Sequence, residues 1–349
     1  MSADNITNNK EQKSRKINVK AVSVKAVKPS PFKIEDGVLI KYTGDEKEVV
    51  IPENVRKIGE NAFENCTSVV SVTIPDGADE IGGYAFRSCT ELVSVKLPKS
   101  INKIGGWAFR GCEKLEAFAI PDGVTVIDDC VFAECSSLTS VEIPTKITEV
   151  RAFAFSGCKS LTSIWLPNSV RLIGKYAFSG CESLESINIP DGISQIDERT
   201  FAKCRSIESV TIPRSVKRIG EYAFKDCTSL KMVELPFNIT TVDGFSGCTS
   251  LKALEIPEFV TELGDFSGCT NLESIKIPAS VHKLKYSFND CPKLMTVTWP
   301  HLSENISRFP AYYAQVVENR KADNKCAYCG GDFKLFSKTC KGCGKKKDY

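Results

Sequence analysis

The chain has 349 residues, is 42% hydrophobic and carries a formal net charge of +3. This hydrophobic content is sufficient for a large core, so the composition excludes a wholly disordered protein. No stretch approaches the roughly 20 consecutive apolar residues that a membrane-spanning helix needs, so we expect no such helix in this sequence.

Charge is distributed unevenly along the chain. Residues 1–31 hold seven Lys and Arg against two Asp and Glu, and residues 321–349 hold eight Lys against three Asp. The middle, residues 32–320, holds 31 basic and 38 acidic residues. Two basic ends therefore flank a mildly acidic body, which is typical of tails that have their own partners or are simply solvated.

Residues 1–31 are predicted to be a basic, disordered arm. From Lys16 onward, charged or polar residues interrupt every apolar pair in this segment. A secretory signal peptide needs an apolar run, so we expect no signal peptide and a cytoplasmic location.

A repeat of about 23 residues follows the arm and fills most of the chain. Prolines recur at nearly constant spacing, and cysteines recur in parallel with them. The prolines are Pro52, Pro75, Pro98, Pro121, Pro144, Pro167, Pro190, Pro213, Pro236, Pro257, Pro278 and Pro300. The cysteines are Cys66, Cys89, Cys112, Cys135, Cys158, Cys181, Cys204, Cys227, Cys248, Cys269 and Cys291.

Each unit predicts one short strand followed by turns. Around Val95, apolar and polar residues alternate with the period of two that is typical of a strand. Pro98 ends the strand because it cannot donate to a ladder, and Gly105 suits a turn. The Ala108-Phe109 pair and Cys112 would point inward over roughly one helical turn. One unit cannot bury this face alone, so the repeat predicts stacked coils, a solenoid.

The pattern resembles the BspA-type leucine-rich repeats, which occur in many bacterial and some protist proteins. The resemblance covers about residues 32–300, where eleven units match. It implies a right-handed leucine-rich-repeat coil of about twelve turns. A parallel β-sheet would lie on the concave face, with irregular or short helical segments on the other. Members of this family are often surface adhesins.

The repeat cysteines are predicted to be small buried hydrophobic residues. Thiols one coil apart that point the same way have poor geometry for a disulfide, and an odd number of them leaves no complete pairing. A reducing environment therefore fits best. Cys130 is an additional cysteine that nothing in the sequence marks as reactive.

Both ends of the solenoid are expected to carry caps. Residues 32–42, with Glu35-Asp36-Gly37 as the turn, predict a hairpin that closes the first coil. Residues 301–325 are interpreted as a C-terminal cap and linker. Within them a helix from Ala311 to Asn319 would turn three residues inward, namely Tyr312, Val316 and Val317.

Two columns of strand residues are expected to be exposed on the concave face. One is mostly serine and leaves the face open, whereas the other varies and includes Trp165, between Glu142 and Asn188. Trp165 is either an anchor for a partner or an aromatic ring that packs on these two neighbours. Glu234 and Glu255 follow one another in the same column. They form either an acidic patch for a basic partner or a merely solvated surface.

A third column precedes the Ala-Phe pair and is rich in aromatic residues. Its members are Asn61, Tyr84, Trp107, Cys130, Phe153, Tyr176, Arg199 and Tyr222. Stacked rings in this column can stabilise the edge of a solenoid, which is the interpretation we favour, or can present an apolar strip to a partner.

Residues 326–349 predict a small zinc ribbon. Cys326 and Cys329 form one C-x-x-C pair, and Cys340 and Cys343 form a second after ten intervening residues. Four thiolates at this spacing suit one tetrahedral, structural zinc ion, and the segment resembles the short zinc ribbons. An iron site or unpaired redox thiols are the alternatives. The lysines of this segment could contact phosphates, but a protein contact is at least as compatible with the sequence.

The sequence predicts no enzyme. It has only two histidines, His282 and His301, and a column of serines without a nearby base is not an array of nucleophiles. We therefore predict a protein-binding or scaffold protein that uses the concave and edge surfaces of the solenoid, with the zinc ribbon as a second interaction module. The alternatives are a cell-surface adhesin of the BspA kind and a nucleic-acid-associated protein that binds through the basic zinc ribbon.

Overall fold

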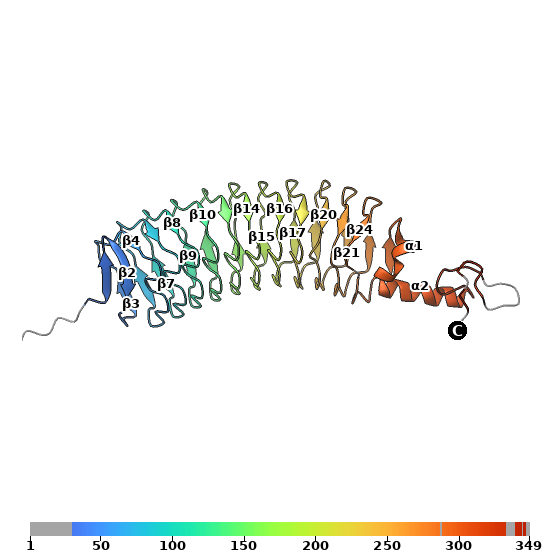
Figure 1. The fold of residues 1–349 in the computed structure, drawn as a ribbon, viewed down its shortest axis with the longest axis horizontal. Helices are drawn as coiled ribbons and strands as arrows, with labels where there is room; N and C mark the ends of the chain where they lie inside the picture. The colour runs from blue at the N-terminus through green and yellow to red at the C-terminus, as the bar shows by residue number, and fades with distance from the viewer. Residues whose placement is uncertain (1–29, 287, 333–338, 344, 347–349) are drawn as a thin grey trace, which may run out of the picture. The chain divides into compact units, whose positions relative to one another are not determined.

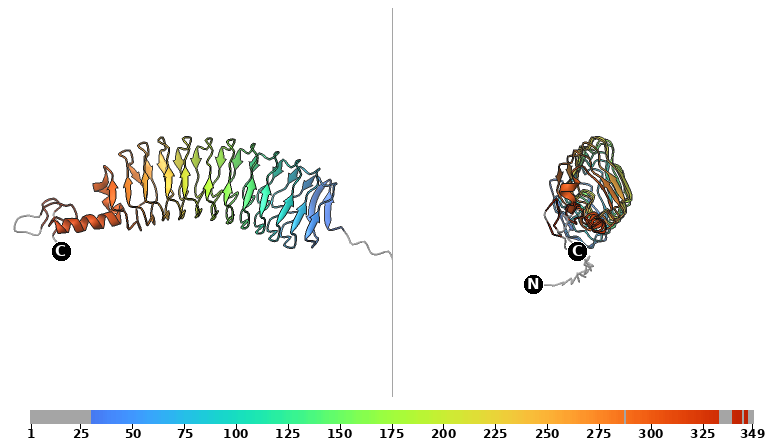
Figure 2. Two further views of the ribbon diagram at one scale, coloured as in Figure 1. Left: turned by 180° about the vertical axis from the view of Figure 1, so that it is seen from behind. Right: turned by 90° about the vertical axis from the view of Figure 1, so that its right-hand side faces the viewer.

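The computed structural model describes residues 30–286, 288–332, 339–343 and 345–346. Between residues 32 and 300 the backbone winds through stacked coils, which Figure 1 shows side by side along a gentle arc. In the right-hand view of Figure 2, along the row, the backbones of the coils overlie one another. The predicted solenoid with parallel strands is therefore confirmed.

The first series of strands forms at the Val-x-Ile segment of each repeat, as predicted. Ser71 pairs with Ser94 and Val72 with Val95, so residues one repeat apart share a column. The series consists of β3 (Glu48–Val50), β5 (Ser71–Thr73), β7 (Ser94–Lys96), β9 (Ala117–Ala119), β11 (Ser140–Glu142), β13 (Ser163–Ile164), β15 (Ser186–Ile187), β17 (Ser209–Thr211), β19 (Met232–Glu234), β21 (Ala253–Glu255), β23 (Ser274–Lys276) and β25 (Thr296–Thr298).

A second series of parallel strands forms at the Ile-Gly segment, where the sequence predicted only a turn. Ile81 pairs with Ile104 of the next coil. A Cβ atom on Gly105 would lie 2.5 Å from the backbone nitrogen of Gly83, so this glycine permits close approach of neighbouring coils. The series consists of β4 (Lys57–Ile58), β6 (Glu80–Ile81), β8 (Lys103–Ile104), β10 (Val126–Ile127), β12 (Glu149–Val150), β14 (Leu172–Ile173), β16 (Gln195–Ile196), β18 (Arg218–Ile219), β20 (Thr241–Val242), β22 (Glu262–Leu263) and β24 (Lys283–Leu284).

The Ala-Phe-x-x-Cys segment forms turns and not the helical turn expected from its spacing. Backbone N–H groups here point alternately within the coil and to the next coil. Tyr84, Phe86 and Ser88 donate to carbonyl groups of the following coil at 3.1, 2.7 and 2.7 Å, whereas Ala85 and Arg87 donate within their own turn. This alternation requires a left-handed backbone at Tyr84 and Ser88, with φ of 57° and 58°.

The left-handed backbone recurs in the same two columns of the other coils. The column that precedes the Ala-Phe pair has positive φ at all eight of its non-glycine members, from Asn61 to Tyr222. The column before the repeat cysteine has it at Asn65, Ser88, Gly111, Glu134, Gly157, Gly180, Lys203, Asp226, Gly247, Gly268 and Asp290. A residue with a Cβ costs roughly 1–2 kcal/mol in this conformation, and the bonds between coils offset that cost.

A ladder of phenylalanine rings runs through the core, one ring from each coil. Its members are Phe63, Phe86, Phe109, Phe132, Phe155, Phe178, Phe201, Phe224, Phe245, Phe266 and Phe288, all at most 1% exposed. Consecutive rings are stacked; Phe86 and Phe109, for example, have centroids 5.2 Å apart and planes 3° apart. Removing one such ring from a core typically costs about 3–5 kcal/mol, so this phenylalanine ladder is a principal source of stability.

The repeat cysteines form a second ladder beside the rings. All of them are free, and all except Cys66 are buried, as predicted. From Cys89 onward each thiol donates a hydrogen bond to a phenylalanine carbonyl of the preceding coil, at 3.1–3.2 Å. The cysteine ladder therefore satisfies buried carbonyl groups while it fills the core.

The two ends of the solenoid are covered differently. At the first coil, β1 (Phe32–Glu35) pairs antiparallel with β2 (Val38–Tyr42), and this hairpin places Tyr42 on Phe63 with ring centroids 4.9 Å apart. After the last coil come α1 (Leu302–Asn305), the 3-10 helix η1 (Ile306–Arg308) and α2 (Pro310–Ala322). Phe309, fully buried, stacks on Phe288 at 4.7 Å and ends the phenylalanine ladder.

The expectation for the inward face of the C-terminal helix was partly wrong. Tyr312 packs against the core, but α2 has no fully buried residue, and Val316 and Val317 are only half-buried. Phe309, directly before α2, supplies the buried contact instead. The predicted helix itself is present and extends slightly beyond the expected residues.

Candidate metal centre and binding surfaces

After α2 the chain forms two tight loops, each with one C-x-x-C pair. In the first, the Cys326 N–H donates to the Gly331 carbonyl at 2.9 Å, and Gly330 turns with φ of 73°. In the second, the Cys340 N–H donates to the Lys345 carbonyl at 2.8 Å. Arg320 on α2 donates to the carbonyl groups of Ala327 and Tyr328 at 3.2 and 3.0 Å, which holds the first loop against the helix.

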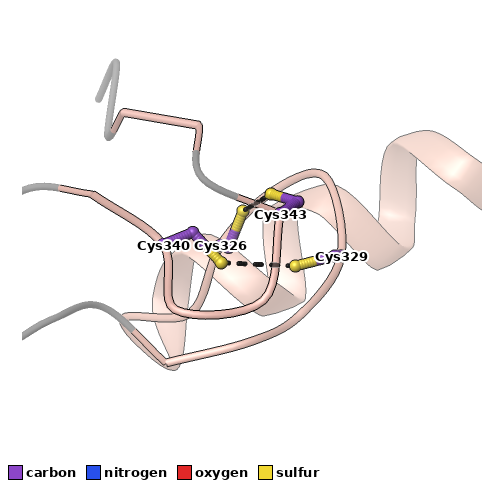
Figure 3. Close-up of side chains that lie close together, drawn as sticks. All are labelled: Cys326, Cys329, Cys340 and Cys343. Atoms are coloured by element: carbon purple, nitrogen blue, oxygen red, sulfur yellow. Dashed lines mark hydrogen bonds between the residues drawn. The ribbon is translucent and has the colours of Figure 1, made fainter.

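The two loops bring together the four sulfur atoms that the spacing predicted. Figure 3 shows the side chains of Cys326, Cys329, Cys340 and Cys343 pointing toward one another. All four sulfurs lie within 4.8 Å, with 3.5 Å between Cys326 and Cys343 and 3.3 Å between Cys329 and Cys340. A tetrahedron with metal–sulfur bonds of about 2.3 Å needs sulfur–sulfur distances of roughly 3.8 Å, so the cluster can hold a metal ion.

Backbone groups favour the thiolate form of Cys340, whereas hydrogen bonds to Cys340 and the other thiols raise the pKa of Cys329 to about 11, so the first thiolate of the cluster forms at Cys340. The N–H groups of Cys343 and Gly342 and a hydrogen bond from Cys329 lower the pKa of Cys340 to about 6. The Gly342 N–H lies 3.2 Å from the sulfur of Cys340. A Cβ atom on Gly331 would be 3.3 Å from two of the sulfurs, so this position leaves little room for a side chain. A metal ligand must be deprotonated, and the backbone N–H groups around Cys340 lower the cost of deprotonation for this one ligand.

Several charged groups of this region are engaged locally. The ammonium group of Lys345 lies 3.7 Å from the centroid of the Tyr328 ring, and Lys325 pairs with Asp332 at 2.5 Å. Three of the lysines expected to be able to contact phosphates, Lys334, Lys338 and Lys347, lie outside the described residues.

Trp165 is exposed, as the alternation predicted. Its side chain follows β13 and is 59% exposed, and Glu142 is exposed at the equivalent position of the preceding coil. Asn188, from the following coil, is half-buried. Its side-chain amide accepts a hydrogen bond from the Leu166 N–H at 2.9 Å and donates one to the Leu166 carbonyl at 2.6 Å. The amide of Asn188 therefore fixes the backbone beside Trp165, while Trp165 and Glu142 face outward.

Glu234 and Glu255 are both exposed and line a common groove. The hydroxyl group of Thr211 donates to Glu234 at 3.0 Å, which orients this carboxylate. Apolar residues that the sequence analysis did not single out share the groove, above all Phe237 and Phe259, which are 60% and 62% exposed. The sequence carried a signal for Phe237, because the residue after the repeat proline is polar or charged in all of the preceding units.

The third column is packed at the edge of the coils. Phe153 and Tyr176 stack with centroids 4.5 Å apart, and Tyr84 lies 5.2 Å from Trp107. Arg199 fills the next position, with its guanidinium carbon 5.4 Å from the Tyr176 ring centroid and 4.8 Å from that of Tyr222. This packing favours the stabilising role over a free apolar strip.

The chain was compared with protein families and solved structures. The family model described as "BspA type Leucine rich repeat region (6 copies)" matches residues 39–162, 148–265 and 243–319. A leucine-rich cell surface protein from Faecalibacterium prausnitzii is 31% identical over 77% of this chain and 92% of its own, with a TM-score of 0.50. A leucine-rich repeat protein from Bacteroides ovatus is 26% identical over 80% of this chain and 95% of its own, with a TM-score of 0.52.

The pneumococcal vaccine antigen PcpA shares the fold at 19% identity, with 77% of this chain and 88% of its own covered and a TM-score of 0.55. None of the curated proteins compared with the chain is similar to it. Among the described residues, no helix has both the length and the apolar character needed to cross a bilayer.

Proposed function

The chain belongs to the BspA-type leucine-rich repeat family, and from this premise we propose that it is a non-enzymatic scaffold that binds a protein partner. Solenoids of this class present extended surfaces on a rigid frame, and specificity depends on the side chains that the frame exposes. The serine column supports this proposal, because its strand neighbours, such as Ser186 beside Ser163, Ala117 beside Ser140 and Met232 beside Ser209, cannot act as a general base.

The exposure of Trp165 carries the proposal. A tryptophan ring left 59% exposed directly after a strand contributes little to the core and offers a large apolar area to a partner. Asn188 supports it indirectly, because its two bonds to Leu166 hold the adjoining backbone in place before any partner binds. Binding at a surface that is already ordered loses less entropy.

A pull-down from native cell extract tests the proposal. Full-length protein should capture a partner that mass spectrometry identifies, and Trp165→Ala should weaken binding of the purified partner about tenfold or more. The melting temperature should stay nearly unchanged, because Trp165 lies outside the core. The matched control is Leu172→Ala, which removes a 39% exposed apolar side chain from the second series of strands and should leave partner binding intact.

Two results would contradict this proposal. If Trp165→Ala lowered the melting temperature by many degrees, Trp165 would be a packing residue. If it left binding unchanged, the partner would bind elsewhere.

We further propose that the metal ion at the four cysteines is zinc and that its role is structural. Four thiolates in a closed set leave no open coordination position for chemistry. A segment with so small a core gains its folding free energy from the metal, so the bound loops would form a second interaction module. The engagement of Lys345 with Tyr328 and of Lys325 with Asp332 favours a protein contact over nucleic acid for this module.

A surface location is a second candidate, and one observation favours it. The similar protein from Faecalibacterium prausnitzii is described as a cell surface protein. The free thiols of the cysteine ladder favour a reducing compartment instead, and on this ground we propose the cytoplasm. Labelling of intact cells with an impermeant reagent decides between them, because a labelled chain would place the protein on the surface.

A further inference from the structure

A second binding surface lies three coils from Trp165, around two exposed phenylalanines. We define the acidic–aromatic groove by Glu234, Phe237, Glu255, Glu258 and Phe259, which line one depression together with Val233, Leu235, Ile256 and Pro257. A second depression adjoins it and shares Glu234, Leu235 and Phe237. Phe237 therefore lines both depressions, and both are open to solvent.

The two rings form an apolar floor that the fold leaves largely exposed. Their centroids lie 6.5 Å apart in an edge-to-face arrangement, and Phe237 and Phe259 are 60% and 62% exposed. Arg214 lies over Phe237 at 5.9 Å, in the second depression. Adjacent aromatic rings with this exposure are unfavourable in water, and such patches typically mark a contact with another molecule.

The rim of the acidic–aromatic groove carries charge of a single sign. Its lining residues include three carboxylates and no Lys, Arg or His. Thr211 holds Glu234 in place at 3.0 Å, so this carboxylate is already oriented. Of the neighbouring lysines, Lys231 pairs with Glu208 at 2.8 Å, and Lys276 lies opposite Glu255 in the sheet. A ligand would thus meet three carboxylates beside an apolar floor, with Lys276 next to Glu255 and Arg214 next to Phe237 at the border of the groove.

We propose that the acidic–aromatic groove binds an extended protein segment in which Lys or Arg alternates with aliphatic residues. This inference rests on the proposed protein-binding function and names the chemistry of one partner. Side chains alternate along an extended segment, so the aliphatic residues would face the rings while the cations reach the carboxylates. Negative charge on the rim disfavours nucleic acid and anionic lipid, and it accelerates the approach of a basic segment.

Fluorescence anisotropy with the full chain tests the inference. The probe is a labelled octapeptide that alternates lysine with valine, and the comparison peptide has glutamate in place of lysine. The lysine peptide should bind at low salt and weaken as salt increases, and the glutamate peptide should not bind. The double variant Phe237→Ser/Phe259→Ser should weaken binding at least about tenfold. Glu255→Gln/Glu258→Gln should weaken it at least about fivefold, with a smaller dependence on salt.

Matched controls are Met295→Ser and Glu185→Gln, which alter exposed residues away from the groove and should leave peptide affinity unchanged. The altered side chains of the groove variants are exposed as well, and an unchanged melting temperature would verify that each variant folds. Failure of the lysine peptide to bind at low salt, equal binding of the glutamate peptide, or unchanged affinity in both groove variants would overturn the inference.

These outcomes are separate from those of the pull-down. The titration uses neither extract nor a change at Trp165. Loss of peptide binding with intact, Trp165-dependent capture would overturn only the groove inference. If the peptides bind as expected but Trp165→Ala leaves the affinity for the captured partner unchanged, only the Trp165 site is overturned.

Discussion

The thiol of Cys158 donates a hydrogen bond of 3.1 Å to the carbonyl oxygen of Phe132 in the preceding coil. Every coil from Cys89 to Cys291 repeats this contact with its own pair of residues. The side chain of Cys158 is fully buried. The contact adds one side-chain bond between neighbouring coils and places the thiol in the core, where burial controls its chemistry.

The buried thiols should be unreactive in the folded protein. Burial raises the pKa of Cys89 and of Cys227 to about 12, so almost no thiolate is present at neutral pH. Iodoacetamide followed by peptide mass spectrometry should therefore leave Cys158 and its equivalents unmodified until the chain is denatured. Cys66, which is partly exposed, is the internal comparison. Alkylation of Cys158 as fast as that of a free thiol in solution would show that the coil opens readily.

Replacing Lys203 by glycine should stabilise the solenoid by about 0.5–1 kcal/mol. Lys203 has a φ of 62°, where a Cβ atom costs roughly 1–2 kcal/mol, and glycine removes this cost. Glycine also increases the conformational entropy of the unfolded chain, which reduces the net stabilisation. The equivalent residues Gly157 and Gly180 show that glycine fits this position. Urea unfolding measures the change. Lys159→Gly, outside the left-handed positions, is the control and should not stabilise; a lower midpoint for Lys203→Gly would refute the strain argument.

Asp243 should make stability depend on pH in a defined direction. Burial raises the pKa of this carboxyl above its ordinary value of 3.8, although Lys285 lies 3.6 Å from one oxygen. The folded state therefore binds the proton more tightly than the unfolded state, and the carboxyl costs stability as the pH rises through the raised pKa. Relative to Asp243→Asn, the natural chain should lose stability as the pH rises above about 4 and through the raised pKa, by about 1.4 kcal/mol for each unit of pKa difference.

Urea midpoints of both proteins across this pH range provide the measurement. Asparagine keeps an acceptor for the N–H groups of Gly244 and Asp265, so the variant should fold. Asp191→Asn, at an exposed position, is the control. A difference between natural chain and Asp243→Asn that stays constant with pH would exclude this role for Asp243.

Elemental analysis should find one zinc ion per chain. A chelator should remove the zinc ion and disrupt the loops around Cys326 and Cys340, because the metal supplies much of their folding free energy. The circular dichroism of the solenoid and its main melting transition should stay unchanged. Cys340→Ser should abolish stoichiometric zinc, and Cys130→Ser should not. A content of two ions or none, or loss of the solenoid on chelation, would contradict the proposed structural site.

Local chemistry explains which features could be predicted from the sequence. The strand at Ser94–Lys96 follows from alternation and from Pro98, and the metal cluster follows from the spacing of cysteines that lie close together in the chain. The left-handed backbone at Tyr84 was not foreseen, because it is imposed by a bond to the next coil and not by the tyrosine. Glycines at the second left-handed column, such as Gly157, carried a partial signal.

The groove residues were missed for a different reason. Glu234 and Glu255 were found because they belong to a strand column, whereas Phe237 and Phe259 lie in the following turns. These two phenylalanines follow their repeat prolines at different intervals, so no single column contains both. Only the folded chain brings the four side chains into one depression.

The regular stacking of coils also sets the spacing of the two proposed binding surfaces. Trp165 and Glu234 occupy one column, three coils apart, which corresponds to roughly 14 Å at the usual strand separation. Because a coil contacts only its neighbours, insertion or deletion of one whole repeat between them would shift this separation by about 4.8 Å while leaving each surface intact. Evolution can therefore adjust the reach of the protein toward a two-point partner by changing the number of repeats, without redesigning either contact.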